Sequence, residues 1–289
     1  MVTHHWGMEL VDPEGKDLPS LKFRFVSDYL RNIRAKGKGN IEKAKSKLKV
    51  LEIGSGNGKI LRSIKKILSH TELFGCDVKK PSVDPKGDYS FTLIKENDLP
   101  YPDQLFDVVV VVDVLEHVKE YVHYISEIRR ILKNDGVFLA FIPCEGQLMS
   151  AYSVSRLFFG RDVFLKTKEH VNSFKRDEIL HLLEKNISLE KIQYSYHLLG
   201  QIMDAVLFTL LLNKRIEKLF WEKNQYYNTK KAAKSSYIAK VFNAVLSSAN
   251  VIAYAESRIL SSISLCSAGI HLVAKNKEDK GVTHQRAHQ

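Results

Sequence analysis

The sequence has few cysteines and no long apolar run. Its three cysteines (Cys76, Cys144 and Cys266) lie far apart and form no CxxC pair, so we expect reduced, buried thiols in a cytoplasmic protein. No stretch of about 18 or more uninterrupted apolar residues occurs, which argues against a membrane-spanning helix. Residues 1–15 are polar and lack the apolar centre of a signal peptide, so we expect none.

Charge of one sign is in excess. The chain of 289 residues has 44 Lys and Arg against 33 Asp and Glu, a net charge of +11. Basic residues gather between Arg31 and Lys49 and again between Lys214 and Lys240. Two interpretations stay open: a solvated face that keeps the protein in solution, or a surface for nucleic acid, acidic lipid or a phosphorylated substrate.

Strand and helix patterns alternate from residue 49 onward. We expect strands at 49–53, 72–78, 90–94, 106–112, 137–142, 187–197 and 268–274, and helices at 21–35, 59–68, 118–132 and 175–185. The valine-rich run at 106–112 is typical of a strand buried on both faces. The alternation predicts a doubly wound, Rossmann-like α/β fold with a seven-stranded, mostly parallel sheet.

Composition divides the chain further. We expect a loose leader over residues 1–20, within an N-terminal leader and helix at 1–40, and a polar, disordered tail at 277–289. Between them we expect a cofactor-binding core at 41–198, a helical insertion at 199–265 and the final core strand at 266–276. The insertion shows helical periodicity, with an apolar stripe from Ile238 to Ile252.

The most informative segment is Val50–Lys59, an apolar strand that enters a glycine-rich turn and then a helix. The glycines at 54, 56 and 58 let the backbone pass beneath a bulky ligand, and the helix directs free N–H groups toward it. A carboxylate at Glu52 would repel phosphate, so it suits a ligand that carries positive charge. The segment predicts a nucleotide-like ligand at the carboxyl end of the first strand.

Two further acids follow the next strands. Asp77 lies 19 residues after Gly58, where a carboxylate can accept hydrogen bonds from ribose hydroxyls. Asp98 can accept from an adenine amino group, with Leu99 beside the base. The alternatives are a capping aspartate and a polar turn before proline.

These segments together resemble a known family. Leu99–Val118 is similar to the L-P-F-x-D-x-x-F-D-x-V-x-x-x-x-V-L-E-H-V stretch of the type-11 branch of class I S-adenosylmethionine-dependent methyltransferases, and Val50–Lys59 resembles motif I of class I. Glu127–Gly136 resembles the family's E-x-x-R-V-L-K-P-G-G, with Asn134-Asp135 in place of Pro-Gly. The resemblance covers residues 45–145 well and 165–195 loosely.

The resemblance implies S-adenosylmethionine as cofactor and attack of a substrate nucleophile on its methyl carbon. It implies cofactor contacts from Glu52, Gly54, Ser55, Gly56, Gly58, Asp77, Val78, Asn97, Asp98, Leu99, Asp113 and Val114. His117 and His170 are the candidate catalytic residues, His170 as general base, although His117 could equally fix its loop by a hydrogen bond. No metal-ligand spacing is apparent, so we expect no metal site.

Substrate choice is expected outside the cofactor half, in the helix at 21–35, the aromatic segment at 150–164 and the insertion. The apolar, lysine-flanked insertion favours a small hydrophobic or lipid-like acceptor and peripheral contact with an anionic membrane, at the inner face. It could instead be a lid or a homodimer interface. An RNA methyltransferase is less favoured, because the N/D-P-P-Y/F tetrapeptide is absent after the fourth strand. A non-catalytic cofactor-binding protein is the third alternative.

Overall fold

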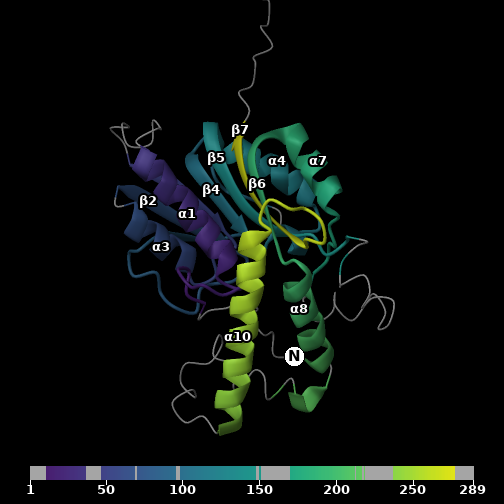
Figure 1. Ribbon diagram of the computed structural model, residues 1–289. Helices are drawn as coiled ribbons and strands as arrows, with labels where there is room; N and C mark the ends of the chain where they lie inside the picture. Colours follow the sequence, from purple (N-terminus) through teal and green to yellow (C-terminus); the bar gives the residue numbers. More distant parts are fainter. Residues whose placement is uncertain are drawn as a thin grey trace, which may run out of the picture.

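The computed structural model describes residues 11–36, 47–68, 70–95, 98–147, 150, 170–211, 213–216, 218 and 237–276. Its centre is a seven-stranded sheet with the order β3-β2-β1-β4-β5-β7-β6 (Figure 1). Only β7 runs antiparallel, to both β5 and β6. The predicted doubly wound sheet is therefore confirmed. The strands are β1 Leu48–Ile53, β2 Thr71–Asp77, β3 Ser90–Leu93, β4 Phe106–Val112, β5 Leu132–Pro143, β6 Ile187–Ser195 and β7 Gly269–Asn276.

Helices cover both faces of this sheet (Figure 1). They are α1 Leu21–Lys36, α3 Lys59–Ile67, η1 Leu115–His117 (a 3-10 turn), α4 Tyr121–Ile131, α7 Arg176–Asn186, α8 Leu198–Leu211 and α10 Tyr237–Ile259. Along β4, Val108 and Val110 pack with α1 and α3, while Val109 and Val111 pack with α4 and α7. This alternation explains the unbroken valine run, because a strand covered on both faces needs apolar side chains at every position.

The structure corrects two sequence-based bounds. The fourth helix begins at Tyr121 rather than at residue 118, because Leu115–His117 form the η1 turn first. Residues 134–136 belong to β5 rather than to a turn that precedes it. Leu132 is already extended and pairs with Phe106, and the register then shifts before the next pair. Asp135 absorbs that shift with a φ of 59°.

The loose leader was a wrong expectation for residues 11–20, whereas residues 1–10 lie outside the described residues. Val11 and Leu18 are only 2% and 1% exposed. The backbone N–H of Leu18 donates to the carbonyl of Asn250 over 3.1 Å, so this segment packs against α10. The cysteines are free thiols; Cys76 and Cys144 are buried as expected, but Cys266 is only half-buried.

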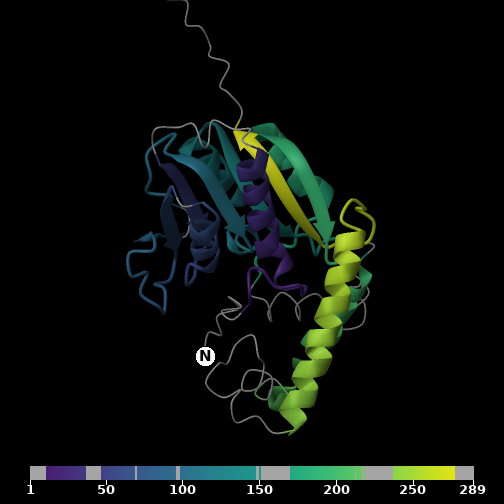
Figure 2. The ribbon, with the colours of Figure 1, turned by 60° about the vertical axis from the view of Figure 1, so that its left-hand side comes forward.

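The predicted helical insertion is a pair of helices, α8 and α10, between β6 and β7. They lie side by side and project away from the sheet (Figures 1 and 2). We call them the arm. At its base the Leu199 N–H of α8 donates to the Glu256 carboxylate of α10. The Tyr196 N–H, just after β6, donates to Ser257 of α10 and so links the arm to the sheet. No helix among the described residues is long and apolar enough to cross a membrane. The division of the chain into domains stays a prediction.

Candidate functional site

The predicted cofactor residues gather where β1, β2 and β4 end. The sheet reverses its winding between β1 and β4, because β2 and β3 follow on one side of β1 while β4 and β5 follow on the other. Such a switch point leaves a crevice at the carboxyl ends of the strands, where ligands of this fold class bind. Loops from both strands meet there: a Cβ on Gly54 would lie 2.5 Å from the Val114 Cγ2.

The glycine turn is held against the end of β2. The N–H groups of Gly54 and Ser55 donate to the Cys76 carbonyl over 2.8 and 3.1 Å. Gly54 and Gly58 have φ angles of 72° and 70°, in the left-handed region that glycine enters without strain. Ser55 is buried, and Gly58 immediately precedes α3. The turn therefore has the left-handed backbone conformation that glycine favours, and it follows the carboxyl end of β1.

Asp77 lies directly across from the middle of this turn. Its Oδ2 accepts the Gly56 N–H over 2.9 Å, and its Oδ1 accepts the Lys79 N–H over 3.0 Å. Each carboxylate oxygen keeps a further lone pair that a hydroxyl could use. Around Gly56 there is open space, since a Cβ placed on it would meet nothing within 4 Å among the described residues. Val78, the next predicted contact, is 52% exposed.

Glu52 is a buried carboxylate beneath the turn. Its residue is 5% exposed, and its Oε2 has no hydrogen-bond partner within the described part of the chain. Burial raises the pKa of Glu52 well above its usual range, and the nearby charge of Asp77 raises it further, against a backbone hydrogen bond from Leu61. A buried carboxyl of this kind gains most from a cationic or hydrogen-donating ligand.

The loop after β3 carries the predicted adenine contacts. Asp98 is exposed and Leu99 is 3% exposed, while Asn97 lies outside the described residues. Arg130 holds this loop by two hydrogen bonds, because its guanidinium donates to the carbonyls of Leu99 and Tyr101 over 3.1 and 2.8 Å.

The same guanidinium also pairs with Glu127 over 2.7 Å. The Glu-x-x-Arg motif of α4 thus ties that helix to the loop beside the crevice.

Asp113 forms an ion pair with a residue that the sequence analysis did not single out. The ammonium of Lys22, at the start of α1, forms an ion pair with Asp113 Oδ2. Lys22 is 6% exposed and also lies over the Phe141 ring, 5.2 Å from its centroid. Asp113 has a φ of 54°, which turns the chain sharply out of β4. No local pattern could have revealed this pair, because 91 residues separate its members.

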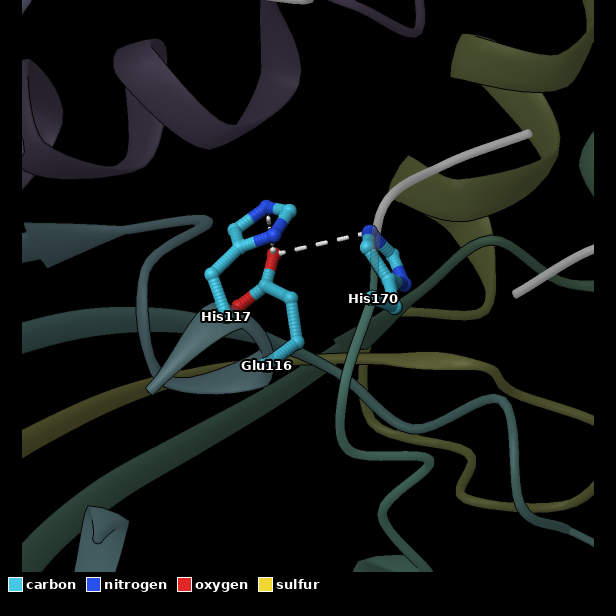
Figure 3. A group of neighbouring side chains, drawn as sticks. All are labelled: Glu116, His117 and His170. Carbon is cyan, nitrogen blue, oxygen red and sulfur yellow. Dashed lines mark ion pairs between the residues drawn. The ribbon is translucent and has the colours of Figure 1, made fainter. Parts of the chain in front are cut away.

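The two predicted catalytic histidines lie next to each other. The rings of His117 and His170 lie edge to face, with centroids 4.9 Å apart (Figure 3). Between them is Glu116, 1% exposed, whose Oε1 is 3.9 Å from His117 Nε2 and 4.0 Å from His170 Nε2. Burial raises the pKa of Glu116 well above its usual range, and Asp113 raises it further.

Sequence reasoning placed Glu116 only within the Asp113–His117 loop, which the family resemblance implies as a cofactor contact, and assigned no role to Glu145. Glu145 Oε2 lies 3.2 Å from His170 Nδ1, and that side chain is 9% exposed. Backbone hydrogen bonds hold the histidine segment in place, because the N–H groups of Val171 and Asn172 both donate to the Glu116 carbonyl over 2.9 Å. The adjacency of Glu116 and His117 was the only sequence signal. The second histidine comes from a distant loop.

Comparison with known proteins gives a family match and a short sequence match. A family model described as "Methyltransferase domain" matches residues 51–140, which include the glycine turn and Asp113–His117. An uncharacterized protein of Methanocaldococcus jannaschii is 43% identical over 51 residues, 18% of this chain. That match spans only about a fifth of the relative's own length (22%).

Solved structures share the fold at low identity. A protein of Galdieria sulphuraria, provisionally assigned as a sarcosine dimethylglycine methyltransferase, matches with a TM-score of 0.52 and 12% identity, over 88% of this chain and 86% of its own. Phosphoethanolamine N-methyltransferase 2 of Haemonchus contortus, bound to S-adenosyl-L-methionine, has a TM-score of 0.50 and 16% identity, over 87% of this chain and 53% of its own. The cyclase SpnF has a TM-score of 0.51 and 15% identity, over 92% and 84%.

Since a cyclase shares this fold, the fold alone does not fix the reaction. The family match is more specific, because it runs from β1 through most of β5 and includes the motifs that gather at the switch point. Residues 51–140 therefore match a methyltransferase domain family, in keeping with the resemblance to the type-11 branch of the class I S-adenosylmethionine-dependent methyltransferases.

Proposed function

We propose that the protein transfers the methyl group of S-adenosylmethionine to a small, hydrophobic or lipid-like acceptor. The observation that carries the methyl-donor half is the glycine turn, where a Cβ on Gly56 would meet open space. The turn has the buried Glu52 before it and Asp77 hydrogen-bonded to its Gly56 N–H. Glu52 would face the cationic methionine end, and Asp77 would accept the ribose hydroxyls.

The remaining predicted contacts complete this assignment. Asp98, Leu99 and Asn97 would flank the adenine, with Val78 beside it. Asp113 and Val114 would close the crevice from β4, where Val114 packs on the glycine turn. Lys22 holds the Asp113 carboxylate in an ion pair, so the loop after β4 has a fixed starting point.

The reaction would be an in-line displacement. A nucleophile of the acceptor attacks the methyl carbon, the carbon–sulfur bond breaks, and its electron pair stays on sulfur as S-adenosylhomocysteine forms. Because the sulfonium is a good leaving group, holding nucleophile, carbon and sulfur in line supplies most of the catalysis. A hydroxyl or acidic carbon must also lose a proton.

His170 is the proposed base in the absence of any metal ion. Its Nδ1 faces the Glu145 carboxylate, an arrangement that puts the proton on Nδ1 and leaves Nε2 as acceptor. His117, with a side chain 40% exposed, would line the acceptor side. His170→Ala should lower turnover at saturating cofactor without weakening cofactor binding. Near-normal turnover in that variant would remove the base role.

The acceptor half of the proposal rests on the arm. Its two helices expose large apolar side chains along their length: Leu198, Leu199, Ile202, Val206 and Leu210 on α8, and Val241, Val245, Val251, Ile252 and Ile259 on α10. Single exposed apolar residues are ordinary, but rows of them mark an interaction surface.

Basic residues mark the end of the arm that is farthest from the sheet. Lys214, Arg215 and Lys218 follow α8 and are exposed, as is Lys240 in the first turn of α10. Apolar faces with cations at one end suit a helix pair that lies in the surface of an anionic membrane, where a lipid-like acceptor would be found.

Vesicle flotation tests the acceptor half. The full chain should float with vesicles that contain phosphatidylglycerol at low salt, and less at high salt, because screening weakens the attraction. It should also float less with phosphatidylcholine alone, because that lipid carries no net charge. The double variant Val245→Asp, Ile252→Asp should stay at the bottom of the gradient. If the unmodified chain does not float with anionic vesicles, the membrane proposal fails; a dimer that the same double variant dissociates would assign the arm to self-association instead.

A further inference from the structure

We propose that Glu116, His117 and His170 bind a divalent transition-metal ion. One oxygen of the glutamate and one nitrogen of each imidazole all lie within 4.8 Å of one another. Figure 3 shows the carboxyl oxygen between the two rings, 3.9 and 4.0 Å from their Nε2 atoms. Three potential ligands from two distant parts of the chain thus converge on one point.

The buried glutamate is the observation that points to a cation. Glu116 is 1% exposed, and neither of its carboxyl oxygens has a hydrogen-bond partner among the residues that the structure describes. Burying a polar group without such a partner costs free energy, whereas a cation between the carboxylate and the imidazoles would satisfy it. Packing alone does not explain a carboxyl group at this position.

His170 is oriented as a metal ligand is. Its Nδ1 lies 3.2 Å from Glu145 Oε2, and donation of that N–H to the carboxylate leaves the Nε2 lone pair toward Glu116. A carboxylate behind a ligating imidazole fixes the tautomer and increases its basicity. The hydrogen bonds from Val171 and Asn172 to the Glu116 carbonyl hold both ligands in one unit.

The ligand set indicates the class of ion. Two imidazoles and a carboxylate suit Zn²⁺, Co²⁺, Mn²⁺ or Fe²⁺, whereas Mg²⁺ and Ca²⁺ favour oxygen ligands. Bonds of about 2.0–2.2 Å require the three groups to close in by somewhat under 1 Å. His117 has room for this movement because its side chain is 40% exposed. That exposed side also leaves positions on the ion for water or a substrate oxygen.

An open position would give the ion a role in catalysis, and this step rests on the proposed function. An acceptor hydroxyl bound to the ion would lose its proton to solvent more readily, and the resulting oxygen would attack the methyl carbon. In the metal-loaded protein, His170 Nε2 is then a ligand and no longer the base.

Metal titration tests the site without reference to activity. The full chain, treated with chelator and dialysed, should bind one equivalent of Zn²⁺ by calorimetry and give a cobalt absorption spectrum that reports imidazole ligands. His117→Ala and His170→Ala should each weaken the affinity by roughly tenfold or more. His181→Ala, which removes an exposed imidazole on α7, should leave it unchanged.

The tail histidines at 4, 5, 284 and 288 are present in every variant, so the difference between variants isolates the proposed site. Equal affinity in the two active-site histidine variants and the wild type would overturn the proposal. Glu116→Gln tests the third ligand; if it does not fold by circular dichroism, the histidine variants decide. Binding of S-adenosylhomocysteine by the metal-free chain is measured separately, so the methyltransferase assignment can fail while the metal site stands.

Discussion

The switch-point crevice and the arm contrast in how they treat polarity and burial. At the crevice, carboxyl groups are buried: Glu52 and Glu116 are 5% and 1% exposed, and both have oxygens without a hydrogen-bond partner in the described chain. Along the arm, apolar side chains are exposed, up to 80% at Ile259. The crevice therefore lacks hydrogen-bond donors or cations for its carboxyl groups, and the arm lacks an apolar surface that covers its side chains. A different kind of partner would supply each.

The contrast separates the two halves of the function. Buried carboxyl groups without hydrogen-bond partners favour a cationic or hydrogen-donating ligand, so the crevice would select the methyl donor and an ion. Exposed apolar rows call for an apolar surface, so the arm would select the acceptor or its location. The following substitutions act on one region and should leave the other intact.

The largest expected effect is in the glycine turn. Gly58→Val should lower the free energy of unfolding by about 3 kcal/mol or more, because its φ is 70° and a Cβ would lie 2.3 Å from the buried Tyr89 ring. Gly56→Ala is the matched control, since its Cβ enters open space and should cost only about 1 kcal/mol.

The same Cβ in Gly56→Ala should nevertheless weaken cofactor binding at least about tenfold, or about 1.4 kcal/mol.

Chemical denaturation and calorimetry separate the two outcomes. A Gly56→Ala protein that is stable but binds S-adenosylhomocysteine normally would place the cofactor elsewhere. A Gly58→Val protein as stable as the wild type would contradict the packing described for the turn.

Glu52→Gln should change how stability depends on pH. Burial raises the pKa of Glu52 in the folded chain, so the folded state keeps a proton that the unfolded state releases above about pH 4.3. The free energy of unfolding should therefore fall as pH rises from there toward the raised pKa, by up to about 1.4 kcal/mol per pH unit. Glu52→Gln should remove this decline and be more stable at neutral pH, while it weakens cofactor binding.

Denaturant titrations across pH provide the measurement, and Glu72→Gln, which changes an exposed carboxyl on β2, is the control. Parallel curves for the wild type and Glu52→Gln would show that the carboxyl is ionised in the empty crevice.

Arg130→Lys should have a smaller effect, a loss of about fivefold in cofactor affinity from about 1 kcal/mol of lost hydrogen bonding. A lysine cannot donate to Leu99, Tyr101 and Glu127 together in the planar arrangement that the guanidinium provides. Asp103→Asn removes only the ion pair to a side chain that is 73% exposed and should leave affinity unchanged. If calorimetry finds the same loss of cofactor affinity in Arg130→Lys and Asp103→Asn, the hydrogen bonds from Arg130 to the loop carbonyls are excluded as the cause.

The smallest expected effect on the crevice comes from the arm. Val245→Asp with Ile252→Asp should leave cofactor affinity unchanged and alter the free energy of unfolding by about 0.5 kcal/mol or less, because both side chains are more than half exposed. Calorimetry and denaturation on the same preparation used for flotation give both quantities. A tenfold loss of cofactor affinity would mean that the arm and the crevice are coupled.

The sequence predicted what local patterns determine. The spacing of Gly54, Gly56 and Gly58 placed the turn, and the valine run of β4 matched its observed bounds, because apolar periodicity and backbone conformation are short-range properties. Bounds failed where the tertiary structure decides, as at residues 134–136, which continue β5 by pairing with β4.

The site needed the structure because its contacts join distant residues. Lys22 and Asp113 are 91 positions apart, and Glu145 and His170 are 25 apart. The burial of Glu116 is likewise a property of the packed fold, set by the segment at 170–172 that folds back over η1. No helical or strand period predicts such contacts, so the Lys22 ion pair has no signal in the sequence. The sequence singled out His117 and His170 as catalytic candidates and predicted no metal site, so the cluster with Glu116 became apparent only in the structure.

The central claim is that the switch-point crevice binds the methyl donor. Calorimetric titration of the full, folded chain with S-adenosylhomocysteine tests it most directly, with Gly56→Ala in parallel. We predict one molecule bound per chain, and at least about tenfold weaker binding by the variant. No binding by the folded wild-type chain, or equal binding by the two proteins, would contradict it.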